Sequence, residues 1–164
     1  MNHPILENVH PMPDNPATPA EQGALLQAAR LARRQAYAPY SGYHVGAAVL
    51  DEAGRIHAGC NVENAAYPEG LCAEAAALAA MVLAGGRHAQ AVVVVGEGGK
   101  NKSAWTTPCG GCRQKLREFA SPTLPIACAN DEASGPVFTL AQLLPESFGP
   151  EHLPSAVHPT PEHR

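Results

Sequence analysis

Three cysteines at two predicted helix starts constrain the fold of this chain more than any other feature. Cys72 lies two residues before Glu74, and Cys109 and Cys112 lie three residues apart in the stretch Pro108–Cys112. At a helix start, free N–H groups and the positive end of the helix dipole favour a thiolate. Residues three apart share one helical face, so the second pair can chelate one metal ion. We therefore predict a fold that brings two helix N-termini together around a metal ion.

This set of side chains is typical of a catalytic zinc site. Zinc with three protein ligands keeps its fourth position for water, whereas a structural site has four protein ligands. Zinc lowers the pKa of that water towards about 7. Glu74 can reach the site from the first helical turn, take the proton of the water and deliver it to a ring nitrogen and then to a leaving amine. The layout resembles the signature of zinc-dependent nucleobase deaminases.

The same residues allow other interpretations. Cys109 and Cys112 could form a thioredoxin-like redox pair, with Trp105 four residues upstream, although such a tryptophan usually adjoins the cysteine. Cys60 could complete a closed four-cysteine site, but it has no partner two to four residues away. Glu74 alone could simply complement its helix dipole.

Cysteine use and charge limit the compartment and the partners. Five cysteines with no evident signal peptide indicate a reducing compartment, and we predict a cytoplasmic protein. The net charge of −4 and the absence of a Lys/Arg run argue against nucleic-acid binding. Arg30, Arg33 and Arg34 share one helical face, which we interpret as solvated. No apolar run reaches the ~18–20 residues that span a membrane. Cys128 is expected in the core.

The order of predicted elements indicates one α/β domain. A capping box at Thr18–Glu21 opens the first helix, which we expect Pro39 to end. The apolar helix at 72–83 is expected to be buried, and the β-branched run at 91–95 to be covered on both faces. The remaining predictions are strands at 43–50, 55–60, 124–129 and 136–138, helices at 109–119 and 139–144, and loops at 61–71 and 97–107.

This order of helices and strands predicts a three-layer α/β/α sandwich on a mixed sheet. Hydrophobic residues make up 45% of the 164 residues, enough for one core. We predict a single domain at 18–153, a disordered lead at 1–17 and a disordered tail at 154–164. The histidines near the C-terminus, His152, His158 and His163, are expected to be solvated.

Beyond the cysteine motifs, most of the chain resembles the small homotetrameric cytidine deaminases. The matching stretches are Ala36–Tyr43, Val45–Ala48, Gly59–Tyr67, Cys72–Glu74, Pro108–Gln114 and Leu143–Pro145. The resemblance implies a cytidine deaminase-like fold, Zn²⁺ held by Cys72, Cys109 and Cys112, Glu74 as the catalytic residue, and a homotetramer whose sites are completed across subunits.

The resemblance also implies how a nucleoside would be held. Asn61 and Glu63 would hydrogen-bond the ribose 3′-hydroxyl, and such recognition of a hydroxyl discriminates strongly. Tyr43 stands in the pocket wall where the family usually has Phe. The N–H of Ala73 would hold the pyrimidine carbonyl, and the C=O of Thr107 would face the exocyclic amine. The full substrate-binding set is Tyr43, Asn61, Glu63, Ala65, Tyr67, Ala73, Thr107 and Phe148.

Phe148 would close the site of a neighbouring subunit. Simpler roles stay open, since Phe148 could just pack the last helix, and Asn61 and Glu63 could cap a loop. One position departs from the family: many members carry Arg immediately after Cys-x-Glu, where this chain has Ala75. Charge compensation of the thiolates would then differ.

The resemblance implies a zinc-dependent hydrolase that converts cytidine and 2′-deoxycytidine to uridine and 2′-deoxyuridine with release of ammonia, a reaction of pyrimidine salvage. One alternative is a deaminase of a modified pyrimidine nucleoside or nucleoside antibiotic. Another, from a different class, is a thiol-redox or structural zinc protein. The acidic charge and the lack of a basic, aromatic-lined groove disfavour a polynucleotide deaminase.

Overall fold

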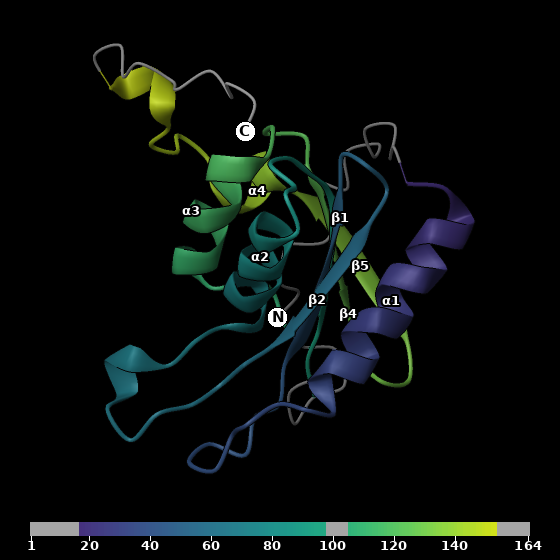
Figure 1. Cartoon of the computed structure of the whole chain (residues 1–164), viewed down its shortest axis with the longest axis vertical. Coiled ribbons are helices and arrows are strands. Elements are labelled where there is room, and N and C mark those ends of the chain that lie inside the picture. Colours follow the sequence, from purple (N-terminus) through teal and green to yellow (C-terminus); the bar gives the residue numbers. More distant parts are fainter. Residues whose placement is uncertain (1–16, 98–104, 154–164) are drawn as a thin grey trace, which may run out of the picture.

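A five-stranded sheet lies between two helical layers in a computed structural model that describes residues 17–97 and 105–153 (Figure 1). The strands are β1 (Gly46–Asp51), β2 (Ile56–Cys60), β3 (Ala89–Val95), β4 (Pro125–Ala129) and β5 (Ser134–Thr139). The helices are α1 (Pro19–Arg33), α2 (Ala73–Leu83), α3 (Gly110–Phe119) and α4 (Leu140–Leu143), with short 3-10 helices η2 (Tyr67–Glu69) and η3 (Pro150–His152). The predicted three-layer α/β/α fold is confirmed.

The sheet is mixed, with strand order β2-β1-β3-β4-β5. Both β2 and β3 pair antiparallel with β1, so these two strands run in the same direction. β4 pairs parallel with β3, and β5 pairs antiparallel with β4. α2 connects β2 to β3, and α3 connects β3 to β4. Because the two helices leave the carboxyl ends of strands with one direction, their N-termini lie at the same edge of the sheet.

Side chains alternate between the two faces of the central strands and form two cores. On one face, Val92 and Val94 of β3 pack with residues of α2 and α3. On the other face, Val93 and Val95 pack with α1. This confirms the prediction that β3 is covered on both sides. Figure 1 shows α1 alone on one side of the sheet, and α2, α3 and α4 on the other.

Two glycines let helices approach the sheet closely. A Cβ at Gly46 of β1 would lie 2.1 Å from the carbonyl oxygen of Ala29 in α1. A Cβ at Gly59 of β2 would lie 2.4 Å from the amide nitrogen of Ala77 in α2. Only a residue without a side chain fits at either contact, so these glycines set the spacing between the layers.

The first helix is shorter than predicted. Its capping box is present, with Thr18 N donating to Glu21 Oε2 at 2.6 Å, but the helix ends at Arg33 rather than at Pro39. Tyr37 leaves the helical path because its backbone pairs with the loop after β2, as its N–H donates to the carbonyl oxygen of Asn61 at 3.0 Å. Long-range pairing thus overrides the local helical pattern at 34–38.

Other boundaries and exposures also differ from the sequence-based expectations. β1 begins at Gly46 instead of residue 43, because side-chain hydrogen bonds hold the backbone of residues 43–45. α2 is not buried all round: Ala79 is exposed, and Leu83 is 90% exposed. Within the described ranges, no helix has both the length and the hydropathy to cross a membrane.

Several predictions concern parts of the chain outside the described residues. These are the lead at 1–17 except for Ala17, the tail at 154–164 with His158 and His163, and positions 98–104 of the predicted loop at 97–107. His152 is described, and it is not simply solvated: its ring stacks on Phe148, with ring centroids 5.2 Å apart.

Candidate active site

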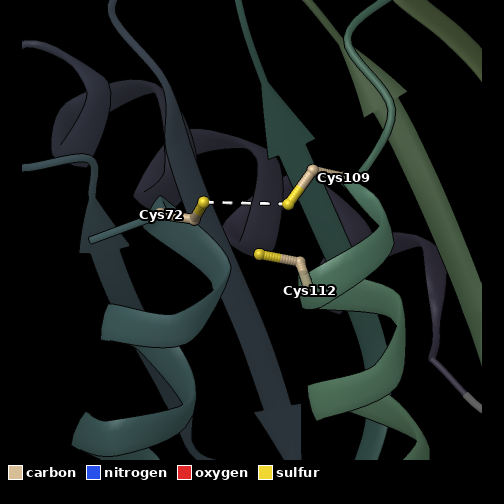
Figure 2. A group of neighbouring side chains, drawn as sticks. All are labelled: Cys72, Cys109 and Cys112. Carbon is tan, nitrogen blue, oxygen red and sulfur yellow. Dashed lines mark hydrogen bonds between the residues drawn. The ribbon is translucent and has the colours of Figure 1, made fainter. Parts of the chain in front are cut away.

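The N-termini of α2 and α3 meet and bring three thiols together. Cys72 is the N-cap of α2, and Cys109 is the N-cap of α3. Cys112 lies one turn further along α3 and is buried. Figure 2 shows the three side chains pointing toward one another from the two helices. The fold therefore brings together the three residues that the sequence predicts as metal ligands.

The spacing of the three sulfur atoms fits a zinc ion. They all lie within 4.8 Å of one another, and the Sγ atoms of Cys72 and Cys109 are 3.8 Å apart. A tetrahedral zinc ion with bonds to sulfur of about 2.3 Å separates two ligand sulfurs by about 3.8 Å. Among the residues that the structure describes, Cys60 does not join this group. Within residues 17–97 and 105–153, the set thus has three candidate ligands.

Two of the three thiols, Cys72 and Cys112, resist ionisation in the absence of a cation. Burial raises the pKa of Cys72, and the negative charge of Cys109 adds to this effect. Burial also raises the pKa of Cys112, and the charge of Glu74 adds to it. Burial acts on Cys109 too, but hydrogen bonds from the backbone and thiol of Cys112 outweigh it and lower the pKa. A metal cation would supply the missing positive charge.

Glu74 lies beside the thiols, in the first turn of α2. Its side chain is 4% exposed, and its Oε2 atom accepts a hydrogen bond from Cys112 Sγ at 3.4 Å. Burial raises the pKa of its carboxyl group. A buried carboxyl group with a raised pKa, next to a candidate metal site, is a candidate for a group that receives and releases a proton.

A cavity of about 430 Å³ opens above the thiols. Its lining includes six of the eight predicted substrate-binding residues together with Cys72, Glu74 and Cys109. These six are Tyr43, Asn61, Glu63, Tyr67, Ala73 and Thr107. Ala65 and Phe148 do not line it; Phe148 is 57% exposed. Among the described lining residues there is no Lys, Arg or His.

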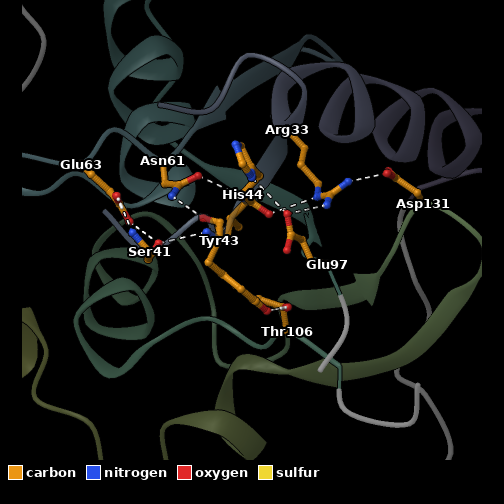
Figure 3. Close-up of polar contacts among 10 residues, drawn as sticks. Arg33, Ser41, Tyr43, His44, Asn61, Glu63, Glu97, Thr106 and Asp131 are labelled. Atoms are coloured by element: carbon orange, nitrogen blue, oxygen red, sulfur yellow. Dashed lines mark hydrogen bonds and ion pairs between the residues drawn. The ribbon is translucent and has the colours of Figure 1, made fainter. Parts of the chain in front are cut away.

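Asn61 and Glu63 shape the loop beside the cavity, as Figure 3 shows. Asn61 Oδ1 accepts from the Val45 N–H at 2.8 Å, and Asn61 Nδ2 donates to the Tyr43 carbonyl oxygen at 2.9 Å. Glu63 Oε2 accepts from the backbone N–H groups of residues 40 and 41, and Oε1 accepts from the Ser41 hydroxyl. Hydrogen bonding from Ser41 lowers the pKa of Glu63. Both side chains thus cap the loop and also face the cavity.

An ionic network that the sequence pattern did not predict lies behind this loop. Arg33 Nε donates to the His44 carbonyl oxygen at 3.0 Å, and its Nη2 lies 3.2 Å from Glu97 Oε1 (Figure 3). Arg33 also pairs with Asp131, and His44 Nδ1 lies 3.0 Å from Glu97 Oε1. The expectation of a solvated arginine face is therefore wrong for Arg33, whose side chain is 14% exposed. Helical periodicity cannot reveal this network, because its partners lie far away in the sequence.

Arg30 and Arg113 are also engaged, whereas Arg34 is exposed, as the predicted solvated face requires. Arg30 donates to the Asn130 carbonyl oxygen at 2.9 Å, which likewise corrects the solvated face. Arg113 of α3 donates to the carbonyl oxygens of Pro108 and Leu143, at 2.7 Å each. Its hydrogen bonds brace the segment before Cys109 and do not go to a sulfur atom. Arg113 therefore does not replace the arginine that many family members carry at the position of Ala75.

Known proteins match this chain over the region that contains the three cysteines and Glu74. Residues 19–128 match the family described as the cytidine and deoxycytidylate deaminase zinc-binding region. The chain is 40% identical over 129 residues to the cytidine deaminase of Sporosarcina psychrophila, covering 79% of this chain and 92% of that protein. It is 42% identical over 119 residues to the cytidine deaminase of Mycobacterium tuberculosis, covering 73% and 83%.

A solved structure agrees with these sequence matches. The crystal structure of cytidine deaminase from Burkholderia pseudomallei aligns with a TM-score of 0.71 at 42% identity, covering 77% of this chain and 98% of that one. The family match spans both cysteine-bearing stretches, and the family binds zinc, the ion that the three thiols fit. The chain belongs to the cytidine and deoxycytidylate deaminase zinc-binding family.

Proposed function

We propose that this chain is a hydrolase that deaminates cytidine and 2′-deoxycytidine to the corresponding uridines and releases ammonia. The observation that carries the proposal is the position of Glu74 beside Cys72, Cys109 and Cys112, at one cavity. Its relatives are named cytidine deaminases, and they match most of its length. We further infer that residues 18–153 form the catalytic domain and that the reaction serves pyrimidine salvage in the cytoplasm.

Glu74 is the proton carrier of the proposed reaction. When bound to the three thiols, zinc supplies the acidity that makes a water molecule nucleophilic near neutral pH. Glu74 takes a proton from the water and passes it to the ring nitrogen N3, while the water oxygen forms a bond to C4. Glu74 then transfers the second water proton to the exocyclic nitrogen. The C4–N bond breaks, ammonia leaves and the uracil carbonyl remains.

Groups around Glu74 hold the nucleoside in this proposal. The Ala73 N–H would donate to the pyrimidine carbonyl, and the Thr107 carbonyl oxygen would accept from the exocyclic amine. Asn61 and Glu63 would bind the ribose hydroxyl. Glu63 already accepts three hydrogen bonds from residues 40 and 41. A carboxylate has about four lone-pair sites, so it can still accept one from the sugar.

The charge of the cavity favours a nucleoside over a nucleotide. The family description includes deoxycytidylate, which carries a phosphate group. The described lining contains two carboxylates, Glu63 and Glu74, and no basic side chain. A phosphate would meet repulsion there without a compensating cation. We therefore infer that this chain acts on unphosphorylated cytidine and 2′-deoxycytidine.

We also infer that the enzyme is a homotetramer with sites completed by neighbouring subunits. Support comes from apolar side chains that a single chain leaves uncovered: Leu83 on α2 is 90% exposed and Tyr67 beside the cavity is 76% exposed. α2 has one charged residue, the inward Glu74, so its outer face is apolar throughout. Such a face is typical of a subunit interface. Phe148 is 57% exposed and would close the cavity of a neighbour.

One assay tests the proposal. Purified protein is analysed for zinc, and ammonia and uridine are measured with cytidine, 2′-deoxycytidine and deoxycytidylate as substrates. We expect one zinc per chain, equal amounts of ammonia and uridine, and little turnover of deoxycytidylate. Cys112→Ser should lose zinc and activity, whereas the matched variant Cys60→Ser should keep both. A zinc-loaded wild-type protein that releases no ammonia from either nucleoside would refute the function.

A further inference from the structure

A hydrogen bond crosses the cavity wall between two segments that are distant in sequence. The Tyr43 hydroxyl lies 2.5 Å from Thr106 Oγ1 (Figure 3). Tyr43 belongs to the segment that leads into β1, and Thr106 to the segment that leads to Cys109. Both residues line the cavity. The bond therefore ties the wall on the Asn61 side to the backbone that carries a metal ligand.

The Thr106 side chain packs closely against Gly96. A Cβ at Gly96, at the end of β3, would lie 1.9 Å from Thr106 Oγ1, so the threonine side chain occupies the space that this glycine leaves free. A Cβ at Gly135 in β5 would likewise lie 2.4 Å from Trp105 Cδ2. The side chains of Trp105 and Thr106 thus pack directly against glycine backbone at Gly135 and Gly96. This packing limits the positions that the Thr106 hydroxyl can take.

The backbone of Tyr43 is also held, but its ring has fewer constraints. Asn61 Nδ2 donates to the Tyr43 carbonyl oxygen, and the Tyr43 N–H donates to Ser41 Oγ at 3.0 Å. The side chain is 38% exposed, and the only polar contact of the ring hydroxyl in the described residues is with Thr106. Without that contact, the ring would lose its polar anchor and gain rotational freedom.

We propose that Thr106 is a positioning residue, which holds the Tyr43 ring in the orientation that receives the base and sugar of the nucleoside. This inference rests on the proposed function. A preset aromatic wall lowers the entropy that substrate binding must remove. The phenylalanine usual in the family cannot form this bond, so this way of orienting the ring depends on the pairing of Tyr43 with Thr106 in this chain. Its effect belongs to binding rather than to the chemical step.

The experiment compares Tyr43→Phe, Thr106→Val and the double variant with the wild type. KM and kcat are measured with cytidine, and the affinity for uridine is measured by calorimetry on the zinc-loaded protein. One neutral hydrogen bond predicts a KM and a uridine Kd raised about 2- to 10-fold, with kcat little changed. The double variant should equal either single variant, because both remove one bond. Thr106→Ser, which keeps the hydroxyl, should resemble the wild type.

Tyr37→Phe is the matched control, since it removes the hydroxyl of a tyrosine that is 56% exposed and does not line the cavity. The inference fails if Thr106→Val leaves KM and uridine affinity unchanged, or if the effects of the two single variants multiply in the double variant. It also fails if Thr106→Ser is as defective as Thr106→Val. A wild type that neither deaminates cytidine nor binds uridine would instead refute the proposed function, and this inference with it.

Discussion

Glu74 is the residue to which the proposed mechanism assigns proton transfer. Its carboxyl group is buried, contacts the Cys112 thiol, and has a pKa raised by burial. Glu74→Gln keeps the size of the side chain and removes its ability to carry a proton. We expect this variant to retain one zinc per chain and to lose about 10²–10⁴-fold in kcat. Zinc analysis and steady-state kinetics on cytidine check this.

Uridine binding provides the control for Glu74→Gln, because a folded, metal-loaded variant should still bind the product. Near wild-type turnover by a fully metallated Glu74→Gln protein would remove Glu74 from the mechanism. Loss of zinc would show that the carboxylate supports the metal site instead of the proton transfer.

Residues with a short sequence signature could be predicted, and residues defined by distant contacts could not. The positions of Cys72, Cys109 and Cys112 at predicted helix starts indicate candidate ligands before any fold is known, and helix geometry places the last two on one face. Arg33 and Thr106 carry no such signature. Their partners lie 11 and 63 residues away, and the segments meet only when the sheet forms. Phe148 illustrates a third case: resemblance predicts a role in substrate binding, but its ring does not line the cavity beside the thiols.

At the scale of elements, Gly59 controls how closely α2 approaches the sheet. A Cβ there would lie 2.4 Å from Ala77 N and 2.6 Å from the Ala73 carbonyl oxygen. Gly59→Ala must therefore push α2 outward, and overpacking of this kind costs about 1–3 kcal/mol or more. We expect a lower Tm and faster zinc loss to a chelator, because the N-terminus of α2 carries Cys72.

Gly23 provides the matched control for Gly59. It lies inside α1, and a Cβ there would have no heavy atom within 4 Å. Gly23→Ala should raise stability by about 0.5–1 kcal/mol through helix propensity alone. Equal melting temperatures for Gly59→Ala and the wild type would mean that α2 can move outward without a loss of stability.

Asp51 at the end of β1 anchors the β1–β2 hairpin. Its carboxylate is fully buried and accepts hydrogen bonds from Ala53 N, from Arg55 N and Nε, and from His57 Nε2 at 2.8–3.0 Å. Burial opposes its ionisation, but the hydrogen bonds, led by that from His57, outweigh this effect and lower the pKa from 3.8 to about 2. The sequence predicts strands at 43–50 and 55–60 but gives no sign of this buried carboxylate between them.

A lowered folded-state pKa makes the contribution of Asp51 dependent on pH. The unfolded carboxyl group binds its proton first, so the stabilisation is present above pH 3.8 and is lost as the pH falls towards about 2. The difference in unfolding free energy between the wild type and Asp51→Asn should therefore be constant near neutrality and shrink below pH about 4. Urea unfolding at several pH values measures it. If the difference in unfolding free energy stays constant from neutral pH to about pH 3, the pKa of Asp51 does not contribute to stability as described.

The architecture of the whole molecule could be predicted because the order of elements leaves few arrangements of layers. Burial was harder to predict, as α2 shows. Its sequence is apolar almost all round, which predicts a buried helix, yet the Leu83 side chain is 90% exposed. An apolar sequence pattern indicates that a helix face is buried, but it does not indicate what the face packs against.

The proposed tetramer predicts a strong effect of charge on that face. Leu83→Lys places an unpaired ammonium group where another subunit would pack, and burying an unpaired charge is highly unfavourable. We expect smaller particles by light scattering and reduced deamination, because the sites lose their neighbours. Gln27→Lys is the control, on the exposed face of α1 across the sheet. A Leu83→Lys protein with the mass of the wild type would exclude α2 from the interface.

The shared edge at which α2 and α3 begin has a consequence for how the chain folds. Cys72 and Cys109 are 37 residues apart, with β3 between them, whereas Cys109 and Cys112 lie within one turn of the same helix start. The third thiol arrives only when β3 has joined the sheet. A zinc ion held by all three thiols would therefore stabilise the native topology over partly folded states in which Cys72 lies apart from the other two.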